Sequence, residues 1–291
     1  MSIETALTTN ERIAELVDDL DSIATLPEVT ARITQIVNDP KSTATDLHRI
    51  ISHDPALVAK ILRLANSSLY ARRYKIDTVD RAIVMLGFDA VHNLAISATI
   101  GQLFNHTTIS DDFTARDLWT HSVAVAAASR EIARRICKPM AEQAFLAGLI
   151  HDVGLLVELQ VCPGKLRQVC RAAKNTTAPF TSLELEIIGC DHAELGGALA
   201  ARWGFPEFCR SVAAYHHYPS LAEPEQRQMV SIVYTADTLC CEDAIGFDLT
   251  ARQQLQDAAS FDGQVPLEVI EEAQQKLPQY VSDAILLFGN E

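Results

Sequence analysis

Histidine and aspartate residues in the second half of the chain stand at spacings that suit metal binding. Asp117 and His121 are four residues apart, so on a helix both side chains project from the same face. His151 and Asp152 are adjacent within the apolar segment LAGLIHDVGLLVEL. Burying a charged carboxylate in such a segment is costly unless another group compensates. A divalent cation would compensate for it efficiently.

Further residues of the same types follow along the chain. They are His192, which comes directly after Asp191 at a predicted helix start, the adjacent pair His216 and His217, and Asp237 in the apolar stretch IVYTADTL. Imidazole nitrogens combined with carboxylate oxygens suit iron, manganese, zinc or nickel. From spacing alone, two interpretations stay open: a metal centre, and a set of histidines at helix ends that are hydrogen-bonded to the backbone.

The elements that must position these residues are predicted to be helices. Helical periodicity dominates the sequence and strand-like alternation is almost absent, so the predicted fold class is all-α with two packed sub-bundles. The polar stretch 105–112 is the expected boundary between an N-terminal bundle, residues 1–108, and a second helical domain, residues 109–291. The predicted helices are 11–20, 27–38, one opened by Asp54 and Pro55, one between Thr78 and Gly87, 88–104, 117–136, 139–159, 191–203, 206–216, 226–241 and 266–288.

The composition of the chain argues against several classes of function. The formal net charge is −14, from 38 acidic and 24 basic residues, and a field of that sign repels nucleic acid. No apolar run is expected to cross a membrane, and the first residues do not resemble a signal peptide. The seven cysteines are odd in number and lack a CxxC arrangement, so we expect reduced thiols in a cytoplasmic protein.

Several blocks of the sequence resemble the HDOD family of bacterial signalling modules. They are LPEVTARITQIV, ISHDPALVAKILRLANSSLY, IDTVDRAIVMLGFDAVHNLAIS and LWTHSVAVAAASREIA, followed by DHAELGGALAARWGFPE and YHHYP. The resemblance covers about residues 20–237. The order of the histidines and aspartates is also similar to the ligand order of HD-superfamily phosphohydrolases, particularly the HD-GYP branch, which hydrolyses cyclic di-GMP. The resemblance therefore implies an HD-like helical core in the second half.

The same resemblance implies roles for individual residues. One or two divalent transition metal ions are expected, with Asp152 able to bridge them and to act as the catalytic residue if the protein is an enzyme. Asp117 stands where some hydrolases place an additional acidic ligand. The implied ligands of a first metal are His121, His151, Asp152 and Asp237, and those of a second are His192, His216 and His217.

One departure from the hydrolase pattern bears on activity. Enzymes of the HD-GYP type have a phosphate-contacting lysine three residues after the paired aspartate, whereas this chain has Leu155. The segment that names that branch is missing as well. An apolar side chain cannot stabilise the charge of a phosphoryl transition state. HDOD modules are regarded as regulatory relatives, so the resemblance implies signalling more firmly than catalysis.

Three hypotheses about function follow. The first is an output or adaptor module of signal transduction that acts on signalling proteins in trans, without nucleic-acid or membrane partners. The second is a metal-dependent phosphohydrolase or phosphodiesterase that acts on a nucleotide or a cyclic dinucleotide second messenger. The third is a structural scaffold with an empty site. Leu155 favours the first over the second, and retention of all the ligand types favours the first two over the third.

Overall fold

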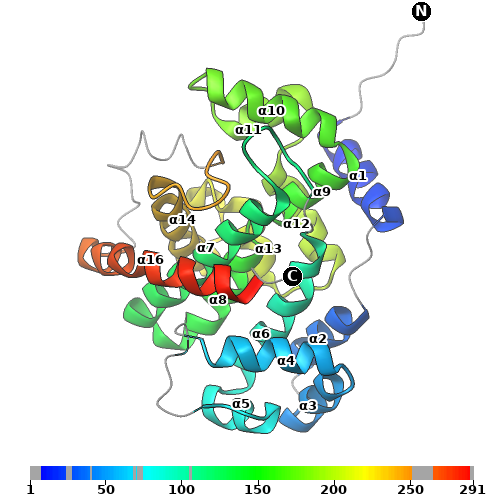
Figure 1. Cartoon of the computed structure of the whole chain (residues 1–291). Coiled ribbons are helices and arrows are strands. Elements are labelled where there is room, and N and C mark those ends of the chain that lie inside the picture. Colours follow the sequence, from blue (N-terminus) through cyan, green and yellow to red (C-terminus); the bar gives the residue numbers. More distant parts are fainter. Residues whose placement is uncertain are drawn as a thin grey trace, which may run out of the picture.

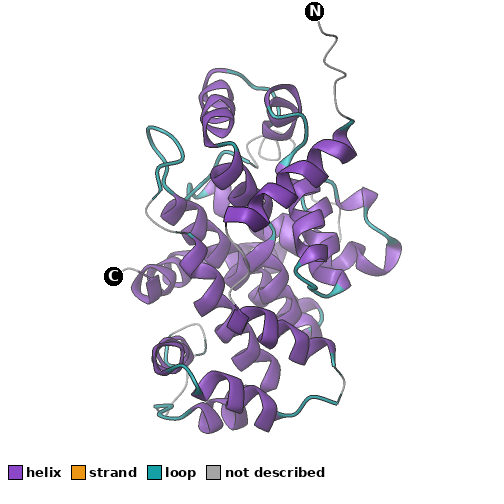
Figure 2. Ribbon diagram, turned by 90° about the vertical axis from the view of Figure 1, so that its right-hand side faces the viewer, coloured by secondary structure: helices purple, strands orange, loops and turns teal. Residues whose placement is uncertain are grey.

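The protein is a packed assembly of helices. The computed structural model describes residues 8–23, 28–39, 41–67, 70, 75–104, 107–250 and 265–288. Within these ranges the regular elements are α-helices and short 3-10 turns, with one isolated bridge between Thr108 and Thr114 and no strand (Figure 2). The predicted all-α fold class is confirmed. Pro27, the expected start of a helix, lies outside the described residues.

Five short helices gather at one end of the molecule, at the bottom of Figure 1. Local capping explains where several of them begin. The carboxylate of Asp54 accepts hydrogen bonds from the backbone of Ala56 and Leu57, and the Thr78 side chain caps the helix that Gly87 ends with a φ of +97°. The helices are α2 (Glu28–Asn38), α3 (Ala44–Ser52), α4 (Pro55–Ala65), α5 (Val79–Leu86) and α6 (Phe88–Ile100).

The first helix in the chain, α1 (Thr9–Ile23), packs elsewhere. It lies against α9 and α12 of the second half, away from α2–α5 (Figure 1). Its side chain Leu16 is 1% exposed, and it belongs to a hydrophobic core that continues through the molecule as far as Leu249. One apolar core therefore joins the N-terminal segment to the second half.

The second half consists of longer helices around a central pair. The helices α7 and α8 pack along each other, α14 contacts both of them, and α16 packs against α7. All seven cysteines of the chain are free thiols, as expected. The elements are α7 (Ala115–Ile136), α8 (Ala141–Ile150), α9 (Val153–Val161), α10 (Pro163–Asn175), α11 (Phe180–Ile187), α12 (His192–Arg202), α13 (Glu207–Tyr215), α14 (Pro224–Glu242) and α16 (Leu267–Phe288).

The prediction of one helix over 139–159 was wrong. The chain forms a 3-10 turn at Lys138–Met140, then α8, which ends at Ile150, and α9, which begins at Val153. Asp152 has φ −95° and ψ 19°, which turns the backbone between the two helices. No proline or polar run marks this turn in the sequence, so hydrophobic periodicity alone could not reveal it.

The stretch Lys138–Val161 also corrects an expectation about membranes. By length and composition it is apolar enough to span a bilayer, with a mean hydropathy of 1.6 in its most apolar window. However, 89% of that window is buried inside the protein. The high hydropathy is explained by its position at the centre of the fold, between α7 and α12.

The two groups of helices meet at a polar joint. The guanidinium carbon of Arg130 on α7 lies 4.4 Å from the ring centroid of Tyr70, and its Nε lies 2.7 Å from a carboxylate oxygen of Glu142 on α8. The side-chain amide of Asn93 on α6 donates to the backbone carbonyl of Glu142 at 2.6 Å. These contacts join α6 to α8 and hold Tyr70 against α7.

Candidate metal centre

Seven of the eight residues proposed as metal ligands lie together in the interior of the second half. They come from five places in the fold: α7, the turn between α8 and α9, the first turn of α12, the end of α13 and α14. Their exposed fractions are between 0% and 4%. The residues are His121, His151, Asp152, His192, His216, His217 and Asp237, and they form two adjoining groups.

The first group consists of His121, His151 and Asp237. The Nε2 atom of His121 lies 3.0 Å from Oδ1 of Asp237, and Nε2 of His151 lies 3.9 Å from the same oxygen. The rings of His121 and His151 are tilted by 53° with centroids 5.3 Å apart, and the ligand atoms of the three residues all lie within 4.8 Å of one another.

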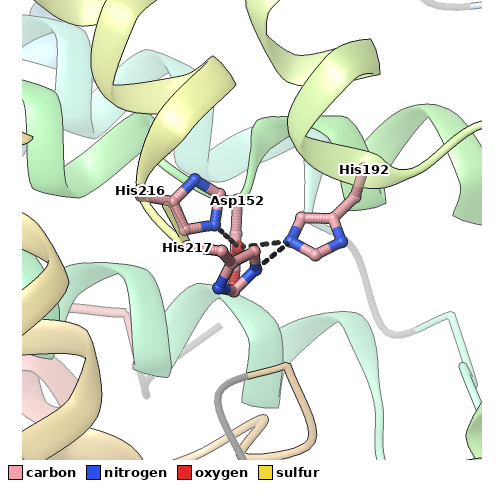
Figure 3. Close-up of side chains that lie close together, drawn as sticks. All are labelled: Asp152, His192, His216 and His217. Carbon is pink, nitrogen blue, oxygen red and sulfur yellow. Dashed lines mark hydrogen bonds and ion pairs between the residues drawn. The ribbon is translucent and has the colours of Figure 1, made fainter. Parts of the chain in front are cut away.

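The second group consists of Asp152, His192, His216 and His217. Figure 3 shows that the three imidazole rings surround the carboxylate of Asp152. Oδ1 of Asp152 lies 3.4 Å from Nε2 of His192 and 3.3 Å from Nε2 of His216. The Nε2 atoms of His192 and His217 are 2.8 Å apart, which brings two ring nitrogens to the same place.

Asp152 faces both groups at once. Its Oδ1 is directed at His192 and His216, whereas its Oδ2 lies 3.3 Å from Nε2 of His151 and 3.9 Å from Nε2 of His121. A carboxylate with one oxygen toward each group has the arrangement that a bridging ligand requires. Asp152 stands in the turn between α8 and α9, and its side chain makes no capping hydrogen bond to α9.

The outward-facing nitrogens of the histidines are held in place. Nδ1 of His121 lies 3.1 Å from the carbonyl oxygen of Ile245, Nδ1 of His151 lies 2.7 Å from that of Gly148, and Nδ1 of His216 lies 3.0 Å from that of Ala213. A carbonyl accepts a hydrogen, so each Nδ1 donates, and in the neutral ring Nε2 presents a lone pair to the centre. Metal-binding histidines are oriented by such outer contacts.

The buried polar atoms of the cluster fit a cation. Nε2 of His151 and of His216, both oxygens of Asp152 and Oδ2 of Asp237 are buried without a hydrogen-bond partner. Buried polar atoms are normally hydrogen-bonded, so several acceptors without a hydrogen-bond partner around one point fit a positively charged ligand. Nitrogen and carboxylate oxygen donors suit a divalent transition metal ion, which when bound to two such groups activates water and neutralises phosphoryl charge.

The charges within the cluster are strongly coupled. Burial alone would raise the pKa of Asp152, but His151, His192 and His216 hold it well below its ordinary range. Burial lowers the pKa of His217 to well below its ordinary value, and the neighbouring histidines add to that effect. Burial also lowers the pKa of His151 and of His192, but the neighbouring carboxylates outweigh burial and raise both values above the ordinary one. Metal binding needs neutral imidazoles, so a cation competes with protons at these two residues.

Asp117 is not brought into the cluster. Its Oδ2 accepts hydrogen bonds from the backbone nitrogen and the hydroxyl of Thr114, both at 2.7 Å, in a capping box at the start of α7. The spacing of four residues from His121 is helical, as expected, but the carboxylate serves the helix start. The structure thus uses Asp117 for capping, outside the two groups of metal-ligand type.

Sequence reasoning did not single out Glu184, a residue that contacts the centre. Glu184 lies on α11, its carboxylate is fully buried, and both of its oxygens are 2.8 Å from Nδ1 of His192. The segment FTSLELEI was not predicted as a helix, and its alternating glutamates look like an exposed stretch. The nearest signal was a glutamate between two apolar residues, Leu183 and Leu185, which is too common to be specific.

Comparisons with known proteins agree with this fold. The HDOD domain family matches residues 23–219, close to the expected 20–237. An HDOD domain protein of unknown function from Geobacter sulfurreducens is 25% identical, with a TM-score of 0.79 over 96% of this chain and 98% of that one. A "putative phosphohydrolase" from Shewanella amazonensis SB2B is 26% identical, with a TM-score of 0.77 over 95% of this chain and 98% of that one.

A relative by sequence is an uncharacterised protein of Treponema pallidum (strain Nichols). It is 27% identical over 241 residues, which cover 81% of this chain and 45% of that protein. This chain thus spans less than half the length of that relative. Because the family match covers more than half of the chain and includes both halves of the fold, the chain belongs to the HDOD domain family.

Proposed function

We propose that this chain is a regulatory module of bacterial signal transduction, an output or adaptor protein that acts on signalling proteins in trans. In this proposal the HD-type centre binds one or two divalent transition metal ions. His121, His151, Asp152 and Asp237 would hold the first ion, and Asp152, His192, His216 and His217 the second. The ions would stabilise or report a conformation of the module. The alternative that the site stays empty is disfavoured by its orphaned buried acceptors.

The observation that carries the proposal is that a cluster of metal-ligand side chains is present while an apolar residue, Leu155, stands where a hydrolase would have its lysine. Leu155, at the position of the phosphate-contacting lysine in related hydrolases, is 1% exposed and packs in the hydrophobic core. No ligand-type side chain of the cluster is more than 4% exposed. A phosphoester that reacts at a metal ion must reach that ion, so burial favours binding over turnover.

A second candidate function is metal-dependent phosphohydrolysis, with a nucleotide or cyclic dinucleotide as substrate. It is favoured by Asp152, whose two oxygens face two groups of ligand type, as in centres that hold a hydroxide between two ions. The Shewanella neighbour described as a phosphohydrolase supports it at 26% identity. Under this alternative Asp152 is the catalytic residue.

The test is metal content. Protein purified with and without oxygen would be analysed by mass spectrometry, beside a variant with both His151→Ala and Asp152→Ala. We expect one or two equivalents of a transition metal, lost in the variant. Absence of metal under both conditions would contradict both the metal-binding proposal and the hydrolase alternative. A metal-loaded protein would then be screened against phosphoesters and cyclic dinucleotides to separate the two candidates.

A further inference from the structure

The outer partner of His192 differs in charge from those of the neighbouring histidines. His121, His151 and His216 place Nδ1 against main-chain carbonyls. His192 instead places Nδ1 against both carboxylate oxygens of Glu184, each at 2.8 Å, and its backbone nitrogen donates to the same carboxylate at 3.3 Å. Glu184 thus contacts both the ring of His192 and the backbone at the start of α12.

A second buried carboxyl stands behind the first. Glu158 on α9 is 0% exposed, and its carboxyl interacts with that of Glu184. Burial raises the pKa of Glu158 to well above its ordinary value, and the charge of Glu184 raises it further. Burial also raises the pKa of Glu184, but His192 opposes that rise. Of the two carboxyls, Glu184 is the one that faces the centre, because both of its oxygens lie 2.8 Å from Nδ1 of His192.

The two halves of the centre differ in their own charges. The first group has the carboxylate of Asp237 in addition to the shared Asp152. The second group has three histidines and only the shared Asp152. A divalent ion among three neutral imidazoles lacks a second anion of its own, and Glu184 is the buried carboxylate that lies one imidazole away.

We propose that Glu184 is a positioning residue for the second half of the centre, where it directs Nε2 of His192 toward Asp152 and supplies the anionic charge that a divalent transition metal ion needs there. This inference rests on the proposed metal binding. If it is correct, metal binding by the second group depends on Glu184 of α11, whereas metal binding by the first group does not. Carboxylate–histidine–metal contacts of this kind change metal affinity about 10–100-fold when the carboxylate is replaced.

The test is a titration of metal-free, full-length protein with Co²⁺ alone. Bound equivalents would be counted by mass spectrometry, affinities by competition with a chelator, and the ligand field by visible absorption. The key variant is Glu184→Gln, which keeps the shape and can still accept from Nδ1 but removes the charge. Glu186→Gln, on the exposed side of the same helix, is the matched control.

We expect wild type and Glu186→Gln to bind two equivalents. Glu184→Gln should keep one equivalent at the wild-type affinity and bind the other about 10–100-fold more weakly, with loss of part of the visible spectrum. The rise in melting temperature on adding Co²⁺ should shrink in the same variant. A role of Glu184 in packing alone would lower the melting temperature of the metal-free protein and leave that rise unchanged.

The possible outcomes distinguish a failure of this inference from a failure of the proposed metal binding. Two equivalents of unchanged affinity in Glu184→Gln overturn the inference and leave metal binding intact. A wild type that binds no Co²⁺ overturns both. If Glu184→Gln does not fold, the variant with both Glu158→Gln and Glu184→Gln replaces it, because two buried amides can hydrogen-bond to each other. The same loss of one equivalent is expected there.

Discussion

The backbone of Gly154 lies directly against the carbonyl of His192. A methyl group at Gly154 would come within 1.8 Å of the His192 oxygen and within 2.7 Å of the backbone nitrogen of Gly196. Real side chains do not approach so closely, so α9 and α12 pack together only because Gly154 lacks a Cβ. Since α9 follows Asp152 and α12 begins with His192, this contact sets the separation of two residues of the centre.

Gly154→Ala should therefore separate α9 from α12. Overpacking of this kind costs about 1–3 kcal/mol in the free energy of unfolding. Metal affinity should fall as well, because His192 moves away from Asp152. Urea unfolding in the presence of a chelator, followed by metal titration, measures both effects. The control is Gly164→Ala on α10, where a Cβ meets nothing within 4 Å. Equal stability of the two variants would contradict the packing argument.

The shared position of Asp152 predicts an unequal effect of single substitutions on metal content. Asp152→Asn should lose both bound ions, because each oxygen faces a different group. Asp237→Asn should lose only the ion of the first group, and His217→Ala only that of the second. Saturating metal at about 100 times the dissociation constant adds about 2.7 kcal/mol to the free energy of unfolding for each site. Thermal unfolding with and without metal should follow the same order.

Metal analysis of the three purified variants checks that pattern. If Asp152→Asn retained one full equivalent, its carboxylate would serve a single ion. If Asp237→Asn lost both equivalents, the two groups would form one inseparable site, and the division of the centre into two positions would be wrong.

Much of the fold was predictable where local chemistry decides the structure. Asp191 is the N-cap of α12 and Glu194 completes the capping box, as the sequence indicates. The helix α3 was missed although Thr43 and Asp46 form a capping box there. The helix α10 was missed as well, although its buried residues, Leu166, Val169, Cys170 and Ala173, follow helical spacing. These two omissions were errors of interpretation, because the signal is present.

The remaining features depend on tertiary structure. The turn at Asp152 lies within an apolar run that would also suit a continuous helix, and packing of α9 on α12 decides between the two. The contact between Glu184 and His192 joins residues on different helices. The types and the order of the residues were enough to predict which side chains form the metal-ligand cluster. They do not indicate which other residues contact the outer nitrogens of the histidines.

Glu158 predicts a pH dependence of stability in the metal-free protein. Its pKa in the unfolded chain is near the ordinary value of 4.5, and burial raises it well above that in the folded protein. Above pH 4.5 the unfolded chain releases this proton while the folded protein keeps it, so the free energy of unfolding falls as pH rises. Glu158→Gln cannot titrate and removes this loss. Its stability relative to wild type should therefore increase from about pH 5 to about pH 8.

Urea unfolding of both proteins at the two pH values measures that difference. A constant difference between Glu158→Gln and wild type across this range would mean that Glu158 has the same proton affinity in the folded and unfolded chains. The buried carboxyl behind Glu184 would then be ionised, and the negative charge outside His192 would be shared between two glutamates.

A substitution at Leu155 distinguishes the proposed regulatory function from the proposed hydrolytic function. Leu155→Lys places an ammonium group where the side chain is now 1% exposed, and burying that charge destabilises the fold unless the group reaches solvent or an anion. Leu155→Met, of similar volume, is the control. We expect Leu155→Lys to unfold at lower urea concentration than Leu155→Met and to show no turnover of cyclic di-GMP in the metal-loaded form. Metal content establishes that the centre is intact in each variant. If Leu155→Lys hydrolyses cyclic di-GMP and the activity disappears when Asp152→Asn is added, one positive charge separates this centre from a working phosphodiesterase. That result would contradict the regulatory proposal and support the hydrolytic one.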